Sequence, residues 1–207
     1  MDNKAMFKLS YGLFVVTARE NGKDNGCIVN TAIQVTSEPN RISVTVNKAN
    51  YTHDMIKNTG KLAVSVLSEA ADFELFKRFG FQSGRDTDKF AGFVGFEKGM
   101  DDIVYITEGT NACIYGKVID TVDVGTHTMF ICDVTDMKVL NDVPSATYTY
   151  YHEHIKPKPE AVKDEATGKI AWRCTICGHV YEGEELPADY ICPLCKHPAS
   201  DFEKVTL

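Results

Sequence analysis

The sequence predicts a mainly β protein of two domains, a β-barrel followed by a very small metal-binding domain. Short strand-like segments recur through residues 1–154, with few helical patterns between them. A polar, proline-containing stretch then breaks the pattern. Beyond it, four of the seven cysteines are grouped in two Cys-x-x-Cys pairs. These observations together predict the division into two domains.

The strand pattern is clearest in five segments of the N-terminal domain. The predicted strands are residues 13–18, 41–46, 62–67, 112–118 and 127–134. Helices are expected only near 51–58 and 70–79, where Phe73, Phe76 and Phe79 recur at a spacing of three. Many strands with few helices predict a β-barrel. No Gly-x-Gly-x-x-Gly motif follows a strand, which disfavours a Rossmann nucleotide site.

A polar segment, residues 155–168, separates the barrel from the tail. Alternating prolines and mixed charges cannot build a core, so this segment is expected to be a semi-extended linker. Residues 169–207 form a domain of about 40 residues, a size that usually needs a disulfide, a metal or a partner. The four cysteines of the tail can meet that need as ligands of a closed tetrahedral site, which suits zinc or a single iron. They are Cys174, Cys177, Cys192 and Cys195.

Charge and cysteine count narrow the class of function. The 22 Lys and Arg against 29 Asp and Glu give a net charge of −7, and no basic stripe is present, so nucleic acid is not expected as a partner. No export signal and no membrane-spanning apolar run are present, so we expect a cytoplasmic protein without membrane association. An odd number of cysteines disfavours a disulfide framework, and Cys27, Cys113 and Cys132 are expected to be buried thiols.

The residues around the tail cysteines resemble the two metal-binding loops of the rubredoxin family. Residues 172–181 read WRCTICGHVY, residues 186–195 read LPADYICPLC and residues 201–203 read DFE. The segment between the loops is short, as in the compact domain appended to rubrerythrins, and Lys196 stands where the longer form often has glycine. The resemblance implies an iron with four Cys ligands and no open position, which makes a one-electron relay. Zinc remains an alternative, and the aromatic neighbours are expected to be packing residues.

Three segments of the N-terminal domain resemble the flavin reductase-like FMN-binding family. Residues 30–39 read NTAIQVTSEP, residues 46–53 read VNKANYTH and residues 125–127 read GTH. Thr126 stands where this family tends to have aspartate. Their order and mutual spacing carry the resemblance, which covers nearly the whole domain. It implies a split barrel, bound FMN and a homodimer.

The residue types in these segments suit flavin mononucleotide. Lys48, Asn50 and Thr52 offer an ammonium, an amide and a hydroxyl beside a predicted helix start, which together would make a phosphate cradle. Thr52 equally suits a helix N-cap without a ligand. Small and polar residues at 30–34 would let the backbone approach a flat ring, and a histidine beside the strand at 127 is expected near the flavin without a proton-transfer role. The expected flavin-binding residues are Asn30, Thr31, Ala32, Ile33, Gln34, Thr36, Ser37, Asn47, Lys48, Asn50, Thr52, His53 and His127.

The combination of domains resembles the fusions called high-molecular-weight rubredoxins of anaerobic bacteria. In that family, electrons pass from an NAD(P)H-dependent rubredoxin reductase to a flavodiiron protein that reduces oxygen or nitric oxide. The resemblance therefore implies an electron-transfer flavoprotein that couples FMN to iron. The alternative is an NAD(P)H-dependent flavin reductase whose tail is an electron outlet or a structural zinc ribbon.

Overall fold

The structure, a computed structural model, describes residues 3–157, 170–175, 178–193 and 198–206. The chain divides into two compact units, Met1–Ile155 and Lys156–Leu207. Most of the predicted linker lies outside the described residues. Within the described part of the chain, no helix is long and apolar enough to cross a membrane.

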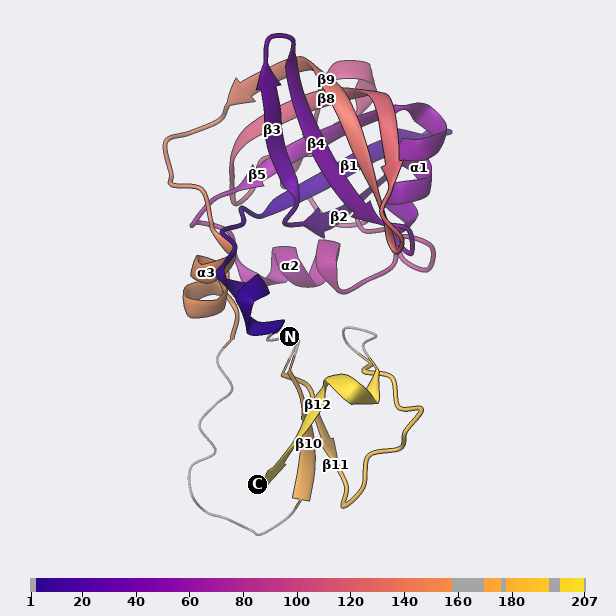
Figure 1. Cartoon of the computed structure of the whole chain (residues 1–207), viewed down its shortest axis with the longest axis vertical. Coiled ribbons are helices and arrows are strands. Elements are labelled where there is room, and N and C mark those ends of the chain that lie inside the picture. The colour runs from indigo at the N-terminus through magenta and orange to yellow at the C-terminus, as the bar shows by residue number, and fades with distance from the viewer. Residues whose placement is uncertain (1–2, 158–169, 176–177, 194–197, 207) are drawn as a thin grey trace. The chain divides into compact units, whose positions relative to one another are not determined.

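The first unit is built on a strongly curved sheet that wraps into an open barrel (Figure 1). All neighbouring strands in this sheet pair antiparallel. In spatial order, its strands among the described residues are β2 (Lys23–Val29), β1 (Phe14–Glu20), β5 (Lys61–Leu67), β8 (Thr110–Asp123), β9 (His127–Val139), β4 (Asn40–Asn47) and β3 (Ala32–Ser37). β2 and β3 form the two edges, although only residues 30 and 31 separate them in the chain. This architecture confirms the predicted mainly β class.

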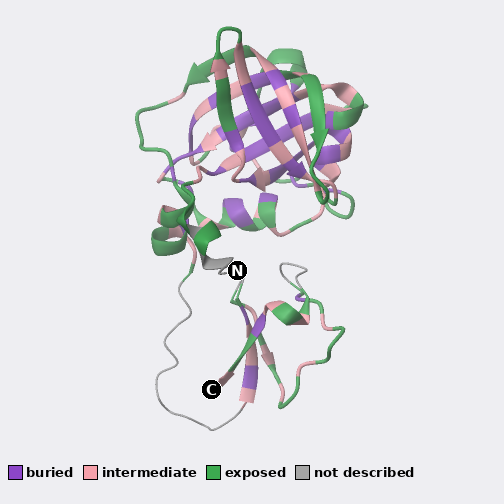
Figure 2. Cartoon of the chain, in the orientation of Figure 1, coloured by how far each residue is buried: buried purple, intermediate pink, exposed green. Residues whose placement is uncertain are grey.

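Apolar side chains fill the interior of the barrel. Val16, Val44, Leu62 and Phe130 are fully buried and belong to one contiguous cluster that draws on several strands. Figure 2 shows buried residues concentrated along the central strands, whereas the outer helices and strand ends are more exposed. The five predicted strands coincide with β1, β4, β5, β8 and β9, because these strands carry the apolar residues that fill the core.

Helix α1 (Tyr51–Thr59) packs against the barrel through Met55 and Ile56, which are fully buried. It begins after Asn50, whose backbone is extended, and it ends at Gly60 in the left-handed region with φ of 68°. Glycine adopts this φ without strain, so it is suited to terminate the helix. The helix predicted near 51–58 is confirmed.

Helix α2 (Phe73–Gly80) lies beside β2 at one end of the barrel (Figure 1). Asp72 caps it, since its side chain accepts a hydrogen bond of 2.9 Å from the backbone N–H of Leu75. Phe76 and Phe79 are buried in a second apolar cluster. The predicted spacing of aromatic residues therefore marks the buried face of this helix.

Shorter elements complete the first unit. An isolated bridge between Gly12 and Thr147 joins the start of the barrel to its end. The shorter elements are η1 (Asn3–Lys8), β6 (Phe96–Lys98), η2 (Met100–Asp102), β7 (Val104–Ile106), α3 (Tyr148–Tyr150) and η3 (Tyr151–Ile155).

The second unit contains a small antiparallel sheet. Among the described residues, its order is β11 (Val180–Glu182), β10 (Ile170–Cys174) and β12 (Phe202–Thr206), and η4 (Ala199–Asp201) precedes the last strand. Its buried hydrophobic residues in the described ranges are Ala171, Cys174, Cys192 and Phe202. So small a core contributes little hydrophobic stabilisation, which agrees with the need for a metal.

Candidate functional site

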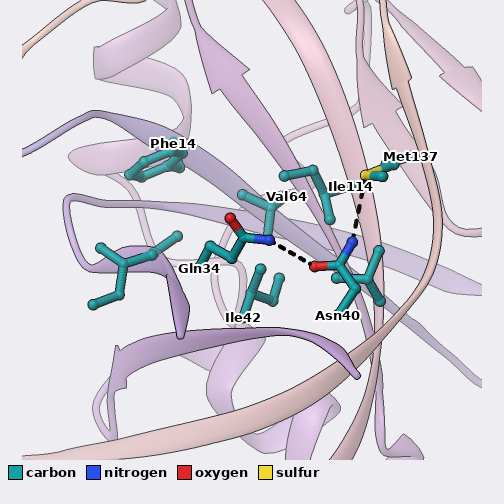
Figure 3. Close-up of a pocket in the computed structure, with 10 residues that line it drawn as sticks. Phe14, Gln34, Asn40, Ile42, Val64, Ile114 and Met137 are labelled. Atoms are coloured by element: carbon teal, nitrogen blue, oxygen red, sulfur yellow. Dashed lines mark hydrogen bonds between the residues drawn. The ribbon is translucent and has the colours of Figure 1, made fainter. Parts of the chain in front are cut away.

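A cavity of about 450 Å³ opens in the barrel beside edge strand β3 (Figure 3). Strands from both halves of the sheet contribute to its wall, and most of the lining side chains are apolar. The lining residues are Phe14, Ala32, Ile33, Gln34, Asn40, Ile42, Val64, Ile114, Val134 and Met137. A cavity of this size and character suits a planar, mostly apolar group with a few polar atoms at its edge.

Three of the predicted ring-binding residues, Ala32, Ile33 and Gln34, line this cavity. The others lie at the two ends of β3. Residues 30 and 31 form the connection from β2, and Thr36 and Ser37 end the strand. The structure therefore brings the middle of the predicted segment to the cavity and places the rest beside it.

A chain of hydrogen bonds links three side chains of the cavity lining. Gln34 Nε2 donates to Asn40 Oδ1 at 3.0 Å, and Asn40 Nδ2 donates to Met137 Sδ at 3.9 Å. Figure 3 shows both bonds, with the side-chain oxygen of Gln34 directed away from Asn40. These two amides are the polar side chains of the lining.

The predicted phosphate-binding residues gather at the far end of β4, where α1 begins. Asn47 faces His127 in the register of β4 and β9. The backbone N–H of Lys48 donates to Thr126 O at 3.0 Å, and Lys48 Nζ donates to Asp123 Oδ1 at 2.7 Å. This ammonium lowers the pKa of the Asp123 carboxyl. The β8–β9 turn therefore holds Lys48 beside the start of the helix.

Thr52 is fully buried in the first turn of α1. Its Oγ1 accepts a hydrogen bond of 3.0 Å from Asn25 Nδ2, and a Cβ added to Gly84 would lie 2.2 Å from Asn25 Oδ1. The N-cap position belongs to Asn50, so the N-cap interpretation of Thr52 is wrong. The Thr52 side chain instead joins α1 to Asn25 on β2, and Asn25 in turn lies against the loop around residue 84.

Two basic side chains that the sequence did not reveal, Lys23 and Arg85, lie beside the first turn of α1. Arg85 Nη2 donates to Asp54 Oδ2 at 2.6 Å, and His53 Nδ1 lies 2.9 Å from Asp54 Oδ1. The Arg85 guanidinium is the largest cause of the lowered pKa of Asp54. Lys23 Nζ and Arg85 Cζ lie 4.8 and 5.2 Å from the centre of the Tyr51 ring. Lys23 and Arg85 are far from the helix in sequence, so no local pattern identifies them.

Strand β4 connects the cavity with this charged end. Ile42 lines the cavity and Asn47 ends the strand, a separation of roughly 17 Å at about 3.3 Å per residue. Next to it, Thr31 Oγ1 donates to Thr45 O at 2.7 Å. A ligand with an aromatic ring at one end and an anionic group at the other would fit along this strip.

In the second unit, the structure describes one cysteine of each Cys-x-x-Cys pair. Cys174 ends β10, and both it and Cys192 are buried. The backbone N–H of Cys174 donates to His179 O at 2.8 Å, and that of Gly178 donates to Cys174 O at 2.9 Å. These bonds hold Gly178 and His179 beside Cys174. Cys177 and Cys195 lie outside the described residues.

The aromatic residues of the second unit pack against one another, as predicted. The rings of Tyr181 and Tyr190 lie 4.7 Å apart, and those of Tyr190 and Phe202 lie 5.4 Å apart. Trp172 is half-buried on β10, and Lys204 Nζ lies 6.0 Å from its ring. Buried thiols fit a metal that is shielded from solvent and closed to substrates.

Comparison with known proteins agrees with this division. Residues 6–158 match the family model described as flavin reductase like domain. The chain belongs to the flavin reductase-like domain family. Residues 172–203 match the rubrerythrin, rubredoxin-like domain, so a rubredoxin-like domain follows the flavin reductase-like domain. Membership of these two families implies a flavin and an iron as cofactors.

Curated relatives share one or both domains. A high molecular weight rubredoxin of Moorella thermoacetica is 36% identical over 230 aligned residues, which cover 99% of this chain and 100% of the relative. A ferric-chelate reductase (NAD(P)H) of Archaeoglobus fulgidus is 41% identical and covers 73% of this chain and 89% of its own length. The full-length similarity to the first relative includes both domains.

A solved structure supports the fold of the flavin reductase-like domain. The NADH:FAD oxidoreductase SgcE6 of Streptomyces globisporus superposes with a TM-score of 0.63 at 21% identity, over 70% of this chain and 84% of its own. This likeness confirms the split-barrel fold that the resemblance predicted.

Proposed function

We propose that this chain is an electron-transfer flavoprotein, with FMN in the flavin reductase-like domain and one iron in the rubredoxin-like domain. The observation that carries the proposal is the presence, on one chain, of two different sites. One is a cavity connected by a strand to a cationic helix start, and the other contains buried cysteines from both Cys-x-x-Cys pairs. The relative from Moorella thermoacetica, described as a high molecular weight rubredoxin, supports it over the full length.

The cavity and the start of α1 would hold the two ends of FMN. The aromatic ring would lie in the apolar cavity against Ala32, Ile33 and Gln34. The phosphate would lie near Lys48 and Asn50, where an ammonium and the helix start favour an anion. Of the remaining predicted residues, those on β3 and on the β2–β3 connection would flank the ring, and those around the start of α1 would support the phosphate end. The flanking residues are Asn30, Thr31, Thr36 and Ser37, and those at the phosphate end are Asn47, Thr52, His53 and His127.

Cys174, Cys177, Cys192 and Cys195 would hold the iron. Four thiolates leave no open position on the metal, so it would exchange electrons without binding substrate. Bound flavin exchanges electrons in pairs or singly, and a four-thiolate iron exchanges one at a time, so together they connect two-electron donors with one-electron acceptors. We infer that the donor is an NAD(P)H-dependent rubredoxin reductase and that the acceptor is a flavodiiron-type oxygen or nitric oxide reductase.

A reducing cytoplasm suits the thiols of the first unit. Cys27, Cys113 and Cys132 are buried and free. Burial raises the pKa of Cys113 to about 11 and that of Cys132 to about 12, so both remain protonated and unreactive. Free thiols in this number are typical of proteins that are kept in a reducing compartment.

We also propose that the protein is a homodimer. Ile33 and Val35 on edge strand β3 are exposed, as are Met137 and Val139 on β9. An exposed, apolar edge strand promotes pairing with another chain unless something covers it. A second copy of this chain would cover these residues.

A second candidate function is an NAD(P)H-dependent reductase that acts on free flavin or on a ferric chelate. The Archaeoglobus fulgidus relative, described as a ferric-chelate reductase (NAD(P)H), supports it, since it matches 73% of this chain at 41% identity. In this case, the tail would serve as an electron outlet or as a structural zinc ribbon. Rapid turnover of added flavin or ferric chelate with NADH would favour this candidate.

The composition of the purified full chain tests the proposal. Flavin released from the protein is identified by chromatography, and iron and zinc are measured on the same sample. The proposal predicts FMN and iron, each in a ratio of about one per chain. Zinc without iron would contradict the relay, and a protein that binds no flavin would contradict the assignment of the cavity.

A further inference from the structure

We propose that Met137 and Asn40 set the hydrogen-bonding polarity of the cavity, so that Gln34 presents a carbonyl oxygen to an N–H group on the edge of the bound ring. Met137 and Asn40 are thus positioning residues that act through Gln34. This inference rests on the proposed function, because it takes the ring in the cavity to be a flavin.

The direction of the hydrogen-bond chain follows from the chemistry of its last member. A thioether sulfur can accept a hydrogen bond but cannot donate one. Asn40 therefore turns its NH₂ group, Nδ2, toward Met137 Sδ, at 3.9 Å. The reverse orientation would place the carbonyl oxygen of Asn40 against a second acceptor. The sulfur thus determines which side of the Asn40 amide faces Gln34.

The same constraint passes from Asn40 to Gln34. Since Asn40 presents Oδ1 to Gln34, the Gln34 amide meets it with its own NH₂ group, and the Nε2 to Oδ1 distance is 3.0 Å. Gln34 Oε1 is then the atom that remains for a ligand. Figure 3 shows this oxygen on the side of the amide opposite Asn40.

The apolar surroundings of Gln34 allow its oxygen to discriminate between rings with and without an N–H group. Apart from the two amides, the cavity is lined by apolar side chains, among them Phe14, Val64 and Ile114. A ring that fills the cavity removes water from this oxygen, so a ring without a donor at its edge would leave the oxygen without a partner. The cavity therefore favours a planar group that carries an N–H.

A flavin ring meets this requirement through the N3–H on its pyrimidine edge. A nicotinamide also carries N–H groups, on its carboxamide, so the two share the chemistry that Gln34 would recognise. The proposed donor is the flavin N3–H. Methylation of N3 removes the donor from the flavin and leaves the ring and the phosphate in place, which makes 3-methyl-FMN a specific probe.

Affinities of the flavin-free full chain for FMN and 3-methyl-FMN test the proposal, measured by quenching of flavin fluorescence. The wild-type protein is expected to prefer FMN by about tenfold. Asn40→Leu removes the partner of Gln34, so the preference should fall to about twofold or less. Met137→Leu keeps the apolar volume without the acceptor and should reduce the preference in the same direction.

Matched variants separate this effect from a general disturbance. Asn40→Asp still accepts from Gln34 Nε2 and should keep the preference for FMN. Asn58→Leu removes another exposed amide, on α1, whose Nδ2 donates to Glu20 Oε1 at 2.9 Å. This variant should bind both flavins as the wild type does. If Asn40→Leu does not fold, as judged by circular dichroism, Met137→Leu and Asn40→Asp decide the question.

The outcomes distinguish this inference from the proposed function. Equal binding of FMN and 3-methyl-FMN by the wild type would overturn the role of Gln34 while flavin binding stands. Binding of neither flavin would overturn the proposed function itself. If Asn40→Leu weakens the binding of NAD⁺ but leaves the preference for FMN over 3-methyl-FMN unchanged, the donor is the nicotinamide, and the inference is wrong.

Discussion

Asn47 and His127 face each other across the pairing of β4 and β9, at the end of the barrel where α1 begins. His127 Nδ1 lies 2.8 Å from Thr126 Oγ1, and the same turn accepts the backbone N–H of Lys48 at Thr126 O. The β8–β9 turn and the junction of β4 with α1 therefore form one local structure. It unites two of the three sequence segments that carried the resemblance to flavin-binding proteins.

Lys48→Ala is predicted to weaken FMN binding and to leave riboflavin binding unchanged. A charge-assisted hydrogen bond to phosphate contributes about 1.5–3 kcal/mol, which corresponds to roughly tenfold to a hundredfold in affinity. Titration of the flavin-free full chain with each flavin measures the effect. Lys98→Ala, on β6, is the control and should bind both flavins normally. An equal loss for FMN and riboflavin would show that Lys48 does not contact the phosphate.

Lys89 is predicted to make the stability of the protein depend on pH in the alkaline range. Its Nζ is buried and donates to Gly26 O at 2.9 Å and to Phe79 O at 3.1 Å. Burial lowers the pKa of Lys89 from 10.5 to about 8. Between these values the unfolded chain binds more protons than the folded chain, so the free energy of unfolding rises with pH. Below about pH 8 both states are protonated, and the cost of burying the ammonium is present in full.

Lys89→Met tests this dependence because methionine does not titrate. Urea unfolding of both proteins is measured from pH 7 to pH 10.5, and the difference in free energy of unfolding is plotted against pH. The wild type should gain relative to the variant as pH rises through this range, by at most about 3 kcal/mol. A difference that stays constant with pH would mean that Lys89 does not titrate in this window.

Cys174→Ser is predicted to remove the metal from the tail and to leave the flavin bound in the barrel. Cys174 is buried and belongs to the first Cys-x-x-Cys pair, and a small domain of this kind depends on its metal for folding. Metal analysis and limited proteolysis of the tail measure the loss. Cys113→Ala, at a buried free thiol of the barrel, is the matched control and should retain the metal. Full metal content in Cys174→Ser would exclude this residue as a ligand.

Val35→Lys is predicted to convert the proposed homodimer to a monomer. Val35 is 48% exposed on edge strand β3, where a lysine would place a charge in the proposed interface. Sedimentation velocity measures the oligomeric state. Val94→Lys changes a valine that is 90% exposed on a loop outside this sheet, and it should remain dimeric. A wild-type protein that sediments as a monomer would contradict the proposal directly.

Much of the barrel could be predicted from the sequence because its strands carry strong apolar patterns. β2 and β3 were not predicted, for physical reasons that differ. β2 begins with polar residues, Lys23 to Asn25, and contains Gly26. β3 lies at the edge of the sheet, with most of its side chains exposed, so it shows little of the alternation that marks a half-buried strand.

The candidate site could be predicted only in part. Residues that share a short segment, such as Lys48 and Asn50, could be found by their spacing. Asn40 and Met137 meet only because β4 pairs with β9, and Arg85 reaches Asp54 from a distant loop. Such contacts depend on the fold rather than on local sequence, so sequence patterns alone do not reveal them.

An anaerobic titration of the purified full chain with NADH, in the presence of a catalytic amount of an NAD(P)H-dependent rubredoxin reductase, tests the central claim most directly. The visible spectrum reports both centres, and flavin and iron are measured on the same sample. The two-centre electron carrier predicts that flavin and ferric-thiolate bands are both present and that both bleach. Flavin bands that bleach in a protein that contains zinc and no iron would contradict it, and would leave a flavin reductase with a structural tail.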